Sequence, residues 1–292
     1  MTSVLIAGPC ISEFGWELME FQGRVRALAK RHDHVVVCST ESLRPLYTDF
    51  NPIFVGHKIR SVRDCHVMRS IETPAEWDRV MAVLSQHKRE FEARGCKVRW
   101  EHSRPSRGTV GTLHAMDQQS FIRYGNADAA KARDRVFDVL LHARNKEGVN
   151  PYYRIFNWPI EKWNTVVKAL TEQGLKLAAI GTKTEALLPT GAVDLRGLEL
   201  SDLMDTMRAA KLIIGPSSGP MHLASLCGTP HFVWTSKQWS STIKADNRGR
   251  YTRVWNPLKT KCWIIDERPD VGADIVVAEI KKIWPELPCT SR

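Results

Sequence analysis

Small residues, two hydroxyls and a histidine follow an apolar run in the segment Gly215-Pro216-Ser217-Ser218-Gly219-Pro220-Met221-His222. The run Leu212–Ile214 predicts a buried strand, and the residues after Gly219 predict a helix. The first backbone N–H groups of a helix have no partner within it, and the helix dipole makes that end positive. Such a turn is suited to binding an anion, above all a phosphate group.

The individual residues of this segment fit that chemistry. Gly219 lets a phosphate approach the backbone closely, Pro220 suits the first helical position, and Ser217 or Ser218 can cap the helix. In an open parallel sheet, ligands bind in the crevice beyond the carboxyl ends of the strands. The segment therefore predicts a site for a phosphate-bearing ligand.

The elements that position this turn follow an alternating strand and helix rhythm. In the first half, strand Val4–Ala7 precedes an amphipathic helix over Glu17–Arg31, and strand Val35–Cys38 precedes a segment that starts at Ser42. Apolar residues at helical spacing predict a surface helix over Glu76–Arg94. This rhythm is typical of a parallel sheet.

The rhythm weakens between about Gly95 and Asp134 and then restarts. The predicted order is strand 136–142, helix 159–173, strand 176–180, helix 200–210, strand 211–215, helix 221–226, strand 231–234 and helix 274–284. The length also favours two domains. We predict an N-terminal Rossmann-like domain over 1–130, a second over 131–273, and a C-terminal helix over 274–292 that crosses back to the first domain.

Composition and charge narrow the class of protein. The 292 residues carry a formal net charge of +10, which favours polyanionic partners such as nucleic acid or phosphorylated glycolipid, although solubility alone explains the same excess. The seven cysteines include no Cys-x-x-Cys pair, so neither a zinc site nor a disulfide framework is expected. No apolar run approaches the roughly 20 residues that cross a bilayer, and the N-terminus predicts a strand rather than a secretory leader. We expect a cytoplasmic protein.

The phosphate-site segment resembles the heptosyltransferase-like glycosyltransferases (family nine), whose donor loop has the form D-[ST]-G-x-x-H-x-A. Three further stretches are similar to that family in the same order. These stretches are Asn157-Trp158-Pro159-Ile160-Glu161-Lys162-Trp163, Leu195-Arg196-Gly197 with Leu200-Ser201-Asp202-Leu203, and Gly228-Thr229-Pro230. The resemblance covers roughly residues 140–235. It departs at the first loop position, where Ser217 replaces the acid that lies near the donor sugar in the family.

The resemblance implies a GT-B fold, with two facing Rossmann-like domains, donor binding in the C-terminal one and acceptor binding in the N-terminal one. It also implies transfer without a metal, with a nucleotide-sugar as co-substrate and no other cofactor; the chain has no Asp-x-Asp element of the metal-dependent kind. Cations and helix ends at strand carboxyl ends would then offset the diphosphate charge. The candidate donor-binding residues are Arg144, Gly181, Lys183, Glu185, Ser217, Ser218, Gly219, Met221 and His222.

Inverting transfer needs a base that takes the proton of the acceptor hydroxyl. The family places it in the first strand-helix turn, which here contains Glu13 and Glu17. The match is loose, because the family has a glycine followed by aspartate and this chain has Gly15-Trp16-Glu17. Glu17 is slightly preferred, and the alternative is an ordinary acid at a helix N-terminus.

A basic stretch with interleaved aromatic residues follows the donor loop, with Asp246 as its only acid. The candidate acceptor-binding residues are Lys237, Trp239, Lys244, Arg248 and Arg250. Cations beside aromatic platforms suit nucleic acid, which favours a hydroxymethylated pyrimidine in DNA, as in bacteriophage base-modifying glycosyltransferases, flipped out of the duplex in the host cytoplasm. The alternatives are a lipopolysaccharide core or other glycan and a non-catalytic nucleotide-binding or polyanion-binding protein. We expect a monomer or a weak dimer.

Overall fold

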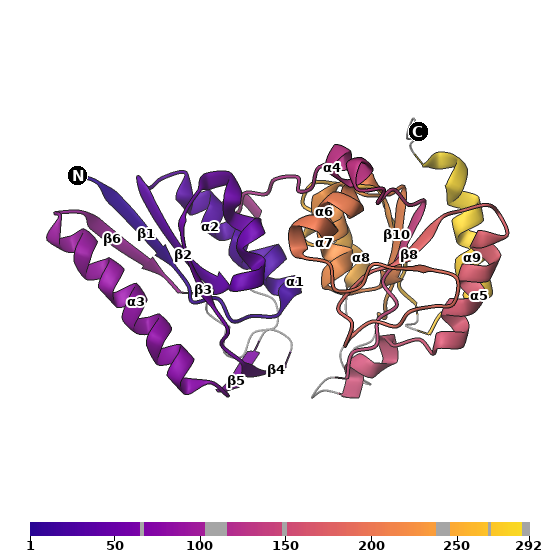
Figure 1. Ribbon diagram of the computed structural model, residues 1–292, viewed down its shortest axis with the longest axis horizontal. Helices are drawn as coiled ribbons and strands as arrows, with labels where there is room; N and C mark the ends of the chain where they lie inside the picture. Colours follow the sequence, from indigo (N-terminus) through magenta and orange to yellow (C-terminus); the bar gives the residue numbers. More distant parts are fainter. Residues whose placement is uncertain (65–66, 103–115, 148–150, 238–245, 268–269, 288–292) are drawn as a thin grey trace. The chain divides into compact units, whose positions relative to one another are not determined.

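The computed structural model describes residues 1–287 apart from 65–66, 103–115, 148–150, 238–245 and 268–269. The chain separates into two units, Met1–Phe121 and Ile122–Arg292, and each contains a parallel sheet with helices (Figure 1). The division lies at Phe121 rather than at residue 130, because α4 (Ala127–Ala132) packs on α6 (Leu200–Ala209) of the second unit. No helix in the described ranges is long and apolar enough to span a membrane.

The first unit is built on a four-stranded parallel sheet of order β3-β2-β1-β6. The strands are β1 (Ser3–Ala7), β2 (His34–Thr40), β3 (Ile53–His57) and β6 (Lys97–Glu101). The two central strands are rich in Val and Ile and buried, as parallel strands covered on both faces must be.

Helices cover both faces of this sheet. One face is covered by α3 (Pro74–Ala93) (Figure 1). Val80 and Leu84 of α3 pack in one cluster with Val4 and Ile6 of β1. The connection from β1 to β2 lies on the other face and contains α1 (Phe14–Trp16), a π-helical segment (Glu17–Phe21) and α2 (Gln22–Ala29). The remaining elements are the 3-10 helix Glu41–Phe50, the antiparallel pair β4 (Ser61–Asp64) and β5 (Val67–Ile71), and the 3-10 turn Met116–Gln118.

The second unit contains a six-stranded parallel sheet of order β12-β11-β10-β7-β8-β9. The strands are β7 (Val139–Leu141), β8 (Leu177–Ala179), β9 (Val193–Asp194), β10 (Leu212–Pro216), β11 (His231–Trp234) and β12 (Cys262–Ile265). From β7 the chain moves outward through β8 to β9, and it then returns to the other side of β7 for β10 to β12. This is the strand order of a Rossmann fold.

Helices lie on both faces of the second sheet as well (Figure 1). They are α5 (Ile160–Thr171) and α9 (Ala273–Ile283) on one face, and α7 (Gly219–Cys227) beside α6 on the other; α8 (Asn247–Arg253) follows β11, and two 3-10 segments are Pro151–Phe156 and Trp284–Glu286. The α/β fold class with two parallel sheets is as the sequence predicted.

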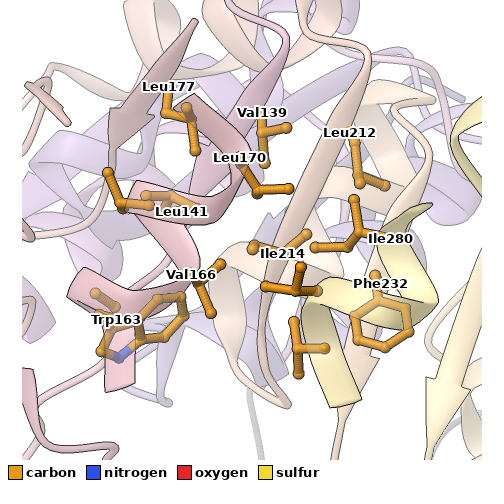
Figure 2. Close-up of a cluster of buried hydrophobic side chains, with 14 of the residues drawn as sticks. Val139, Leu141, Trp163, Val166, Leu170, Leu177, Leu212, Ile214, Phe232 and Ile280 are labelled. Carbon is orange, nitrogen blue, oxygen red and sulfur yellow. The ribbon is translucent and has the colours of Figure 1, made fainter. Parts of the chain in front are cut away.

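The main core of the second unit lies between α5, α9 and the sheet (Figure 2). Trp163 and Leu170 of α5 pack with Ile214 and Phe232 of the strands and with Ile280 of α9. The C-terminal helix therefore belongs to the second unit, which corrects the prediction that it crosses back to the first. The apolar face of α9 packs against α5 and the sheet, as the helical spacing of its apolar residues predicts.

Candidate functional site

The strand order of the second unit places a topological switch point between β7 and β10. The connections that leave these two neighbouring strands run in opposite directions, and sheets of this class bind ligands beyond the strand carboxyl ends at such a point. Ser217, Ser218 and Gly219 follow β10 there, and Arg144 follows β7. The predicted phosphate segment and a predicted cation thus meet at the position where this class of sheet binds nucleotides.

The turn after β10 has the strand-turn-helix geometry that the sequence predicted. Ser217 N–H donates to Trp234 O at 2.9 Å, and the carbonyl of Ser218 accepts from the N–H groups of Met221 and His222 at 3.1 and 3.2 Å. Ser218 is the extended N-cap residue and Gly219 begins α7. Ser217, Ser218 and Gly219 are only half-buried, so a ligand can reach the turn.

Tight packing behind the turn fixes its position. A Cβ on Gly215 would lie 3.1 Å from His142 O and 3.1 Å from Met221 Sδ, which is closer than side chains normally pack. Met221, predicted to contact the donor, is fully buried there. It shapes the turn from behind rather than facing a ligand.

The two serines of the turn have different hydrogen bonds. Ser218 Oγ donates to Pro216 O at 3.0 Å, so that hydroxyl points back to the strand. Ser217 Oγ accepts a 3.0 Å hydrogen bond from the phenol of Tyr251 on α8. Tyr251 is fully buried, and burial raises the pKa of its phenol, which therefore stays protonated.

His222 stands on the first turn of α7 and is 7 % exposed. Its ring packs against Tyr251 and Trp255, with centroid distances of 5.4 and 4.7 Å. Burial, with a smaller contribution from His231, lowers its pKa to about 3. His222 is therefore a neutral imidazole near pH 7, and its Nδ1 has no hydrogen-bond partner among the described residues.

Arg144 brings a positive charge to the carboxyl end of β7. The residue is 7 % exposed, and its Nη1 donates to Asn157 Oδ1 at 2.8 Å. Asn157 also receives the Lys146 N–H at 3.2 Å and donates to Lys146 O at 2.9 Å, so it fixes the backbone after Arg144. Burial and, to a smaller extent, the charge of Arg144 lower the pKa of His142 to about 4.

The loop after β8 supplies the other predicted donor residues, one strand beyond β7. Gly181 has φ +121°, and a Cβ there would lie 2.8 Å from Ala186 Cβ, so this turn requires glycine. Lys183 and Glu185 are exposed, and Glu185 pairs with Lys146 at 3.8 Å. Lys146 is a further cation at the carboxyl ends of these strands. The sequence did not indicate it, because its partner Glu185 follows a different strand.

In the first unit, the carboxyl end of β1 leads into the turn with the two glutamates. Glu17 is fully buried, and its Oε1 accepts hydrogen bonds from Tyr47 OH at 2.6 Å and from the Ser39 hydroxyl. Burial, with the charge of Glu17, raises the pKa of the neighbouring Cys10 thiol. A carboxylate enclosed in this way is better suited to stabilising the turn than to contacting an acceptor.

Glu13 lies at the start of the same turn and is partly exposed. It is the extended N-cap of α1, and its carbonyl accepts from the N–H groups of Trp16 and Glu17 at 2.9 and 3.0 Å. Its position at the carboxyl end of β1 is the one that a ligand of a parallel sheet would meet. Of the two predicted glutamates, Glu13 is the more accessible and Glu17 is enclosed.

Glu101 is a further acid that sequence reasoning missed, at the carboxyl end of β6 beside β1. Its oxygens pair with Arg24 Nε at 3.2 Å and Arg99 Nη2 at 2.6 Å. Burial raises its pKa, but the hydrogen bonds from Arg99 and Arg24 outweigh burial and lower it. A carboxylate held in this way is a weak proton acceptor.

The predicted basic acceptor stretch is less available than its sequence indicates. Asp266, just beyond that stretch, pairs with Lys237 Nζ at 3.8 Å and Arg248 Nη2 at 2.9 Å. The guanidinium of Arg250 lies 5.3 Å from the centre of the Trp255 ring. Trp239 and Lys244 lie outside the described residues.

Two aromatic residues of that stretch, Trp234 and Tyr251, are fully buried, so neither offers a face on which a base could stack. Asp246 is the only acid within the stretch, and the fold adds Asp266 from the end of the next strand, β12.

Metal and thiol chemistry have few candidates in the ranges that the structure describes. No group of three or more His, Cys, Asp or Glu side chains there is arranged to hold a metal ion. Cys10, Cys38, Cys96, Cys227 and Cys262 are free thiols.

The turn of Ser217 to Gly219 lies inside a stretch that matches a known protein family. Residues 156–233 match glycosyltransferase family 9 (heptosyltransferase). This family 9 region begins at the end of the 3-10 helix before α5 and ends in β11. It therefore includes α5, the Gly181 turn, the phosphate segment and α7. No curated protein sequence matches the chain.

Solved structures extend the likeness to the fold of the whole chain. A family 9 glycosyl transferase from Veillonella parvula superimposes with a TM-score of 0.64 and 13 % identity, over 97 % of this chain and 98 % of that one. The E. coli ADP-heptose lipopolysaccharide heptosyltransferase II gives 0.63 and 14 %, over 98 % and 99 %. E. coli heptosyltransferase WaaC with ADP gives 0.53 and 10 %, over 96 % and 99 %. Residues 156–233 thus match the family 9 model, and the whole chain has a fold like that of GT-B glycosyltransferases.

Proposed function

We propose that the protein is a glycosyltransferase that takes a sugar from a nucleotide-sugar bound at the switch point of the second unit. The main support is the half-buried turn of Ser217 to Gly219 at the start of α7, together with Arg144, which follows the adjacent strand β7. The positive end of a helix and a guanidinium on neighbouring strand ends are groups that bind a diphosphate. The family 9 match over 156–233 supports the same assignment.

The donor is proposed to be a nucleoside diphosphate sugar, with an ADP-sugar as the first choice. Two similar structures support that choice, since one is named for ADP-heptose and one contains ADP. Arg144 and the N-terminus of α7 would stabilise the charge that develops on the leaving diphosphate, and Lys183 lies on the next loop. Glu185 remains the proposed contact for the ribose or the base.

The acceptor is proposed to be a glycan hydroxyl of the lipopolysaccharide-core class rather than a base in DNA. Two of the cations expected to contact a nucleic acid backbone, Lys237 and Arg248, share the carboxylate of Asp266, which offsets part of their charge. Two of the similar structures are heptosyltransferases, one of them named for lipopolysaccharide. DNA glucosylation is the alternative against which this proposal is tested.

The proposed reaction is an inverting displacement without a metal ion. Glu13 accepts the proton of the acceptor hydroxyl as its oxygen bonds to the anomeric carbon and the nucleoside diphosphate leaves. Glu17 keeps the turn that carries Glu13 in place through Tyr47 and Ser39. Transfer is therefore expected to continue in excess EDTA.

The proposal is tested first by thermal stabilisation of the protein with ADP-, UDP- and GDP-sugars, because a ligand that binds the folded state raises the melting temperature. Transfer from the best donor is then measured to truncated lipopolysaccharide and to duplex DNA containing hydroxymethylcytosine. Product on the lipopolysaccharide alone is expected. Product on the DNA alone would refute the acceptor class, and no binding or turnover with any nucleotide-sugar would refute the function.

Matched variants tie the activity to the site. Lys183→Ala and Arg144→Ala should weaken donor binding by about tenfold, the size expected for a lost charged hydrogen bond. The control is Lys168→Ala, because Lys168 is an exposed lysine on α5 that pairs only weakly with Glu172 at 4.0 Å. Equal donor binding by all three variants would remove the switch point from the proposal.

A further inference from the structure

The phenol of Tyr251 lies directly behind the proposed diphosphate turn. Tyr251 comes from α8, which follows β11, whereas the turn follows β10. Its hydroxyl lies 3.0 Å from Ser217 Oγ, and the side chain is fully buried. Because no solvent reaches this phenol, its hydrogen bonds must all be made within the protein or with a bound ligand.

The hydrogen bonds around the phenol decide which proton the turn can offer. A hydroxyl donates one proton and accepts through two lone pairs. The Tyr251 proton goes to Ser217 Oγ. Ser218 has already given its hydroxyl proton to Pro216 O. Among the described hydrogen bonds the Ser217 hydroxyl proton has no acceptor, so it can be donated to a ligand.

We propose that Tyr251 is a positioning residue that fixes the Ser217 hydroxyl as a hydrogen-bond donor to a phosphate oxygen of the nucleotide-sugar. The inference rests on the proposed function. It assigns the chemistry of Ser217, which occupies the first position of the family's donor loop. The family pattern has an acid at that position, and an ionised carboxylate can only accept hydrogen bonds. In this chain the position donates one, so it suits an anionic oxygen rather than a sugar hydroxyl.

The rest of α8 keeps the phenol in place. Asn247 Nδ2 donates to Thr235 Oγ1 at 2.9 Å and to Ser236 O at 2.5 Å, which ties the start of α8 to the end of β11. Asp246 caps the helix by accepting from Gly249 N–H at 2.8 Å. The ring of Tyr251 then meets Trp255 edge-on at 5.2 Å. A group held on three sides is preorganised for ligand binding.

The test is a double-mutant cycle read by calorimetry with whichever of ADP, UDP and GDP the intact protein binds most tightly. Ser217→Ala and Tyr251→Phe should each raise Kd by about 3- to 10-fold, the range of a single hydrogen bond to a charged group. The double variant should be no worse than Ser217→Ala, because Tyr251 acts through Ser217. Ser217→Asp should bind the nucleoside diphosphate more weakly than Ser217→Ala, since it adds a negative charge.

Thr252→Ala is the matched control on α8. Its hydroxyl is exposed and bonds only to the backbone of its own helix, at 3.1 Å from Arg248 O. This variant should keep the Kd of the intact protein. Melting temperatures of all variants identify any that lose the fold, and Ser217→Ala, at a half-buried small residue, gives a readout even if Tyr251→Phe unfolds.

The outcomes separate this inference from the function on which it rests. If the intact protein binds a nucleoside diphosphate but Ser217→Ala and Tyr251→Phe bind it equally well, the positioning role is wrong and the function stands. Additive losses in the double variant, or tighter binding by Ser217→Asp, would also overturn it. If the intact protein binds none of the three nucleotides, the proposed function itself fails.

Discussion

The guanidinium of Arg144 donates a 2.8 Å hydrogen bond to the side-chain oxygen of Asn157, which lies 13 residues later in the chain. Asn157 is neutral, so it orients the guanidinium without cancelling its charge. The same amide holds Lys146 through both its oxygen and its nitrogen. Asn157 is therefore expected to set the direction of the cation that faces the switch point.

Replacement of Asn157 by Asp separates orientation from charge. The carboxylate is the same shape and keeps the contact with Arg144, but it neutralises the local charge and cannot donate to Lys146 O, so we expect about tenfold weaker nucleoside diphosphate binding at low ionic strength. Asn157→Ala should lose a smaller factor, because the cation remains although it is less well held. Titration calorimetry at low and high salt checks this, and a salt-independent loss in Asn157→Asp would contradict the electrostatic reason.

Glu13→Gln and Glu17→Gln should have opposite effects. Without a base, Glu13→Gln should lower kcat by about 10²- to 10⁴-fold and leave the melting temperature nearly unchanged. Glu17→Gln should lower the melting temperature, because its amide nitrogen cannot accept the buried hydrogen bonds of a carboxylate. Initial rates at saturating donor and thermal unfolding are the two measurements. Normal turnover in Glu13→Gln would exclude it as the base.

The second unit should lose stability in mild acid. Burial lowers the pKa of His142 and His231 to about 4 and that of His222 to about 3, against an ordinary value of 6.5. As pH falls through 6.5, the unfolded chain takes up protons that the folded unit does not, so stability is full above pH 6.5 and is lost below it. Each histidine should remove about 2 kcal/mol between pH 7.5 and pH 5.

Urea unfolding followed by tryptophan fluorescence checks this prediction. Trp158, Trp163 and Trp234 stack within the core of the second unit, with ring centroids 4.4 to 5.5 Å apart, and should report its unfolding. His231→Gln should reduce the pH dependence by about one proton, whereas the exposed His34→Gln should not. Equal stability at pH 7.5 and pH 5 would show that the buried histidines do not resist protonation.

Asp266 is expected to restrain polyanion binding. Because it pairs with Lys237 and Arg248, Asp266→Asn should free both cations and tighten binding to duplex DNA or heparin about three- to tenfold at low salt. Fluorescence anisotropy with a labelled duplex measures the effect, with Asp270→Asn as an exposed control. If the intact protein already binds DNA tightly through these two residues, the glycan proposal loses its electrostatic support.

The sequence predicted the central strands and the long helices, because their apolar pattern is set by burial. It missed strands at sheet edges, such as β6 and β12, whose polar residues and partial exposure dilute that pattern. It also missed α8, which has little apolar periodicity and depends on the Asp246 cap and the buried Tyr251. The parallel fold followed from the alternation of elements, whereas the division at Phe121 depended on where α4 packs.

The turn of Ser217 to Gly219 could be predicted because its strand, turn and helix are contiguous in the chain. Pairs that depend on strand order could not, since Tyr251 and Ser217 lie 34 residues apart and Lys146 and Glu185 follow different strands. The burial of Glu17 could not be predicted either, because its partners Ser39 and Tyr47 lie 22 and 30 residues away in the chain.

The packing of α9 on α5 means that the polypeptide passes from one unit to the other once, at Phe121 and Ile122. A protein in which the last helix returned would need two matched breakpoints to exchange either half. Here a single recombination event at one junction would deliver either unit intact to a new partner. Evolution of such a chain can therefore proceed by fusion of whole units as well as by point substitution.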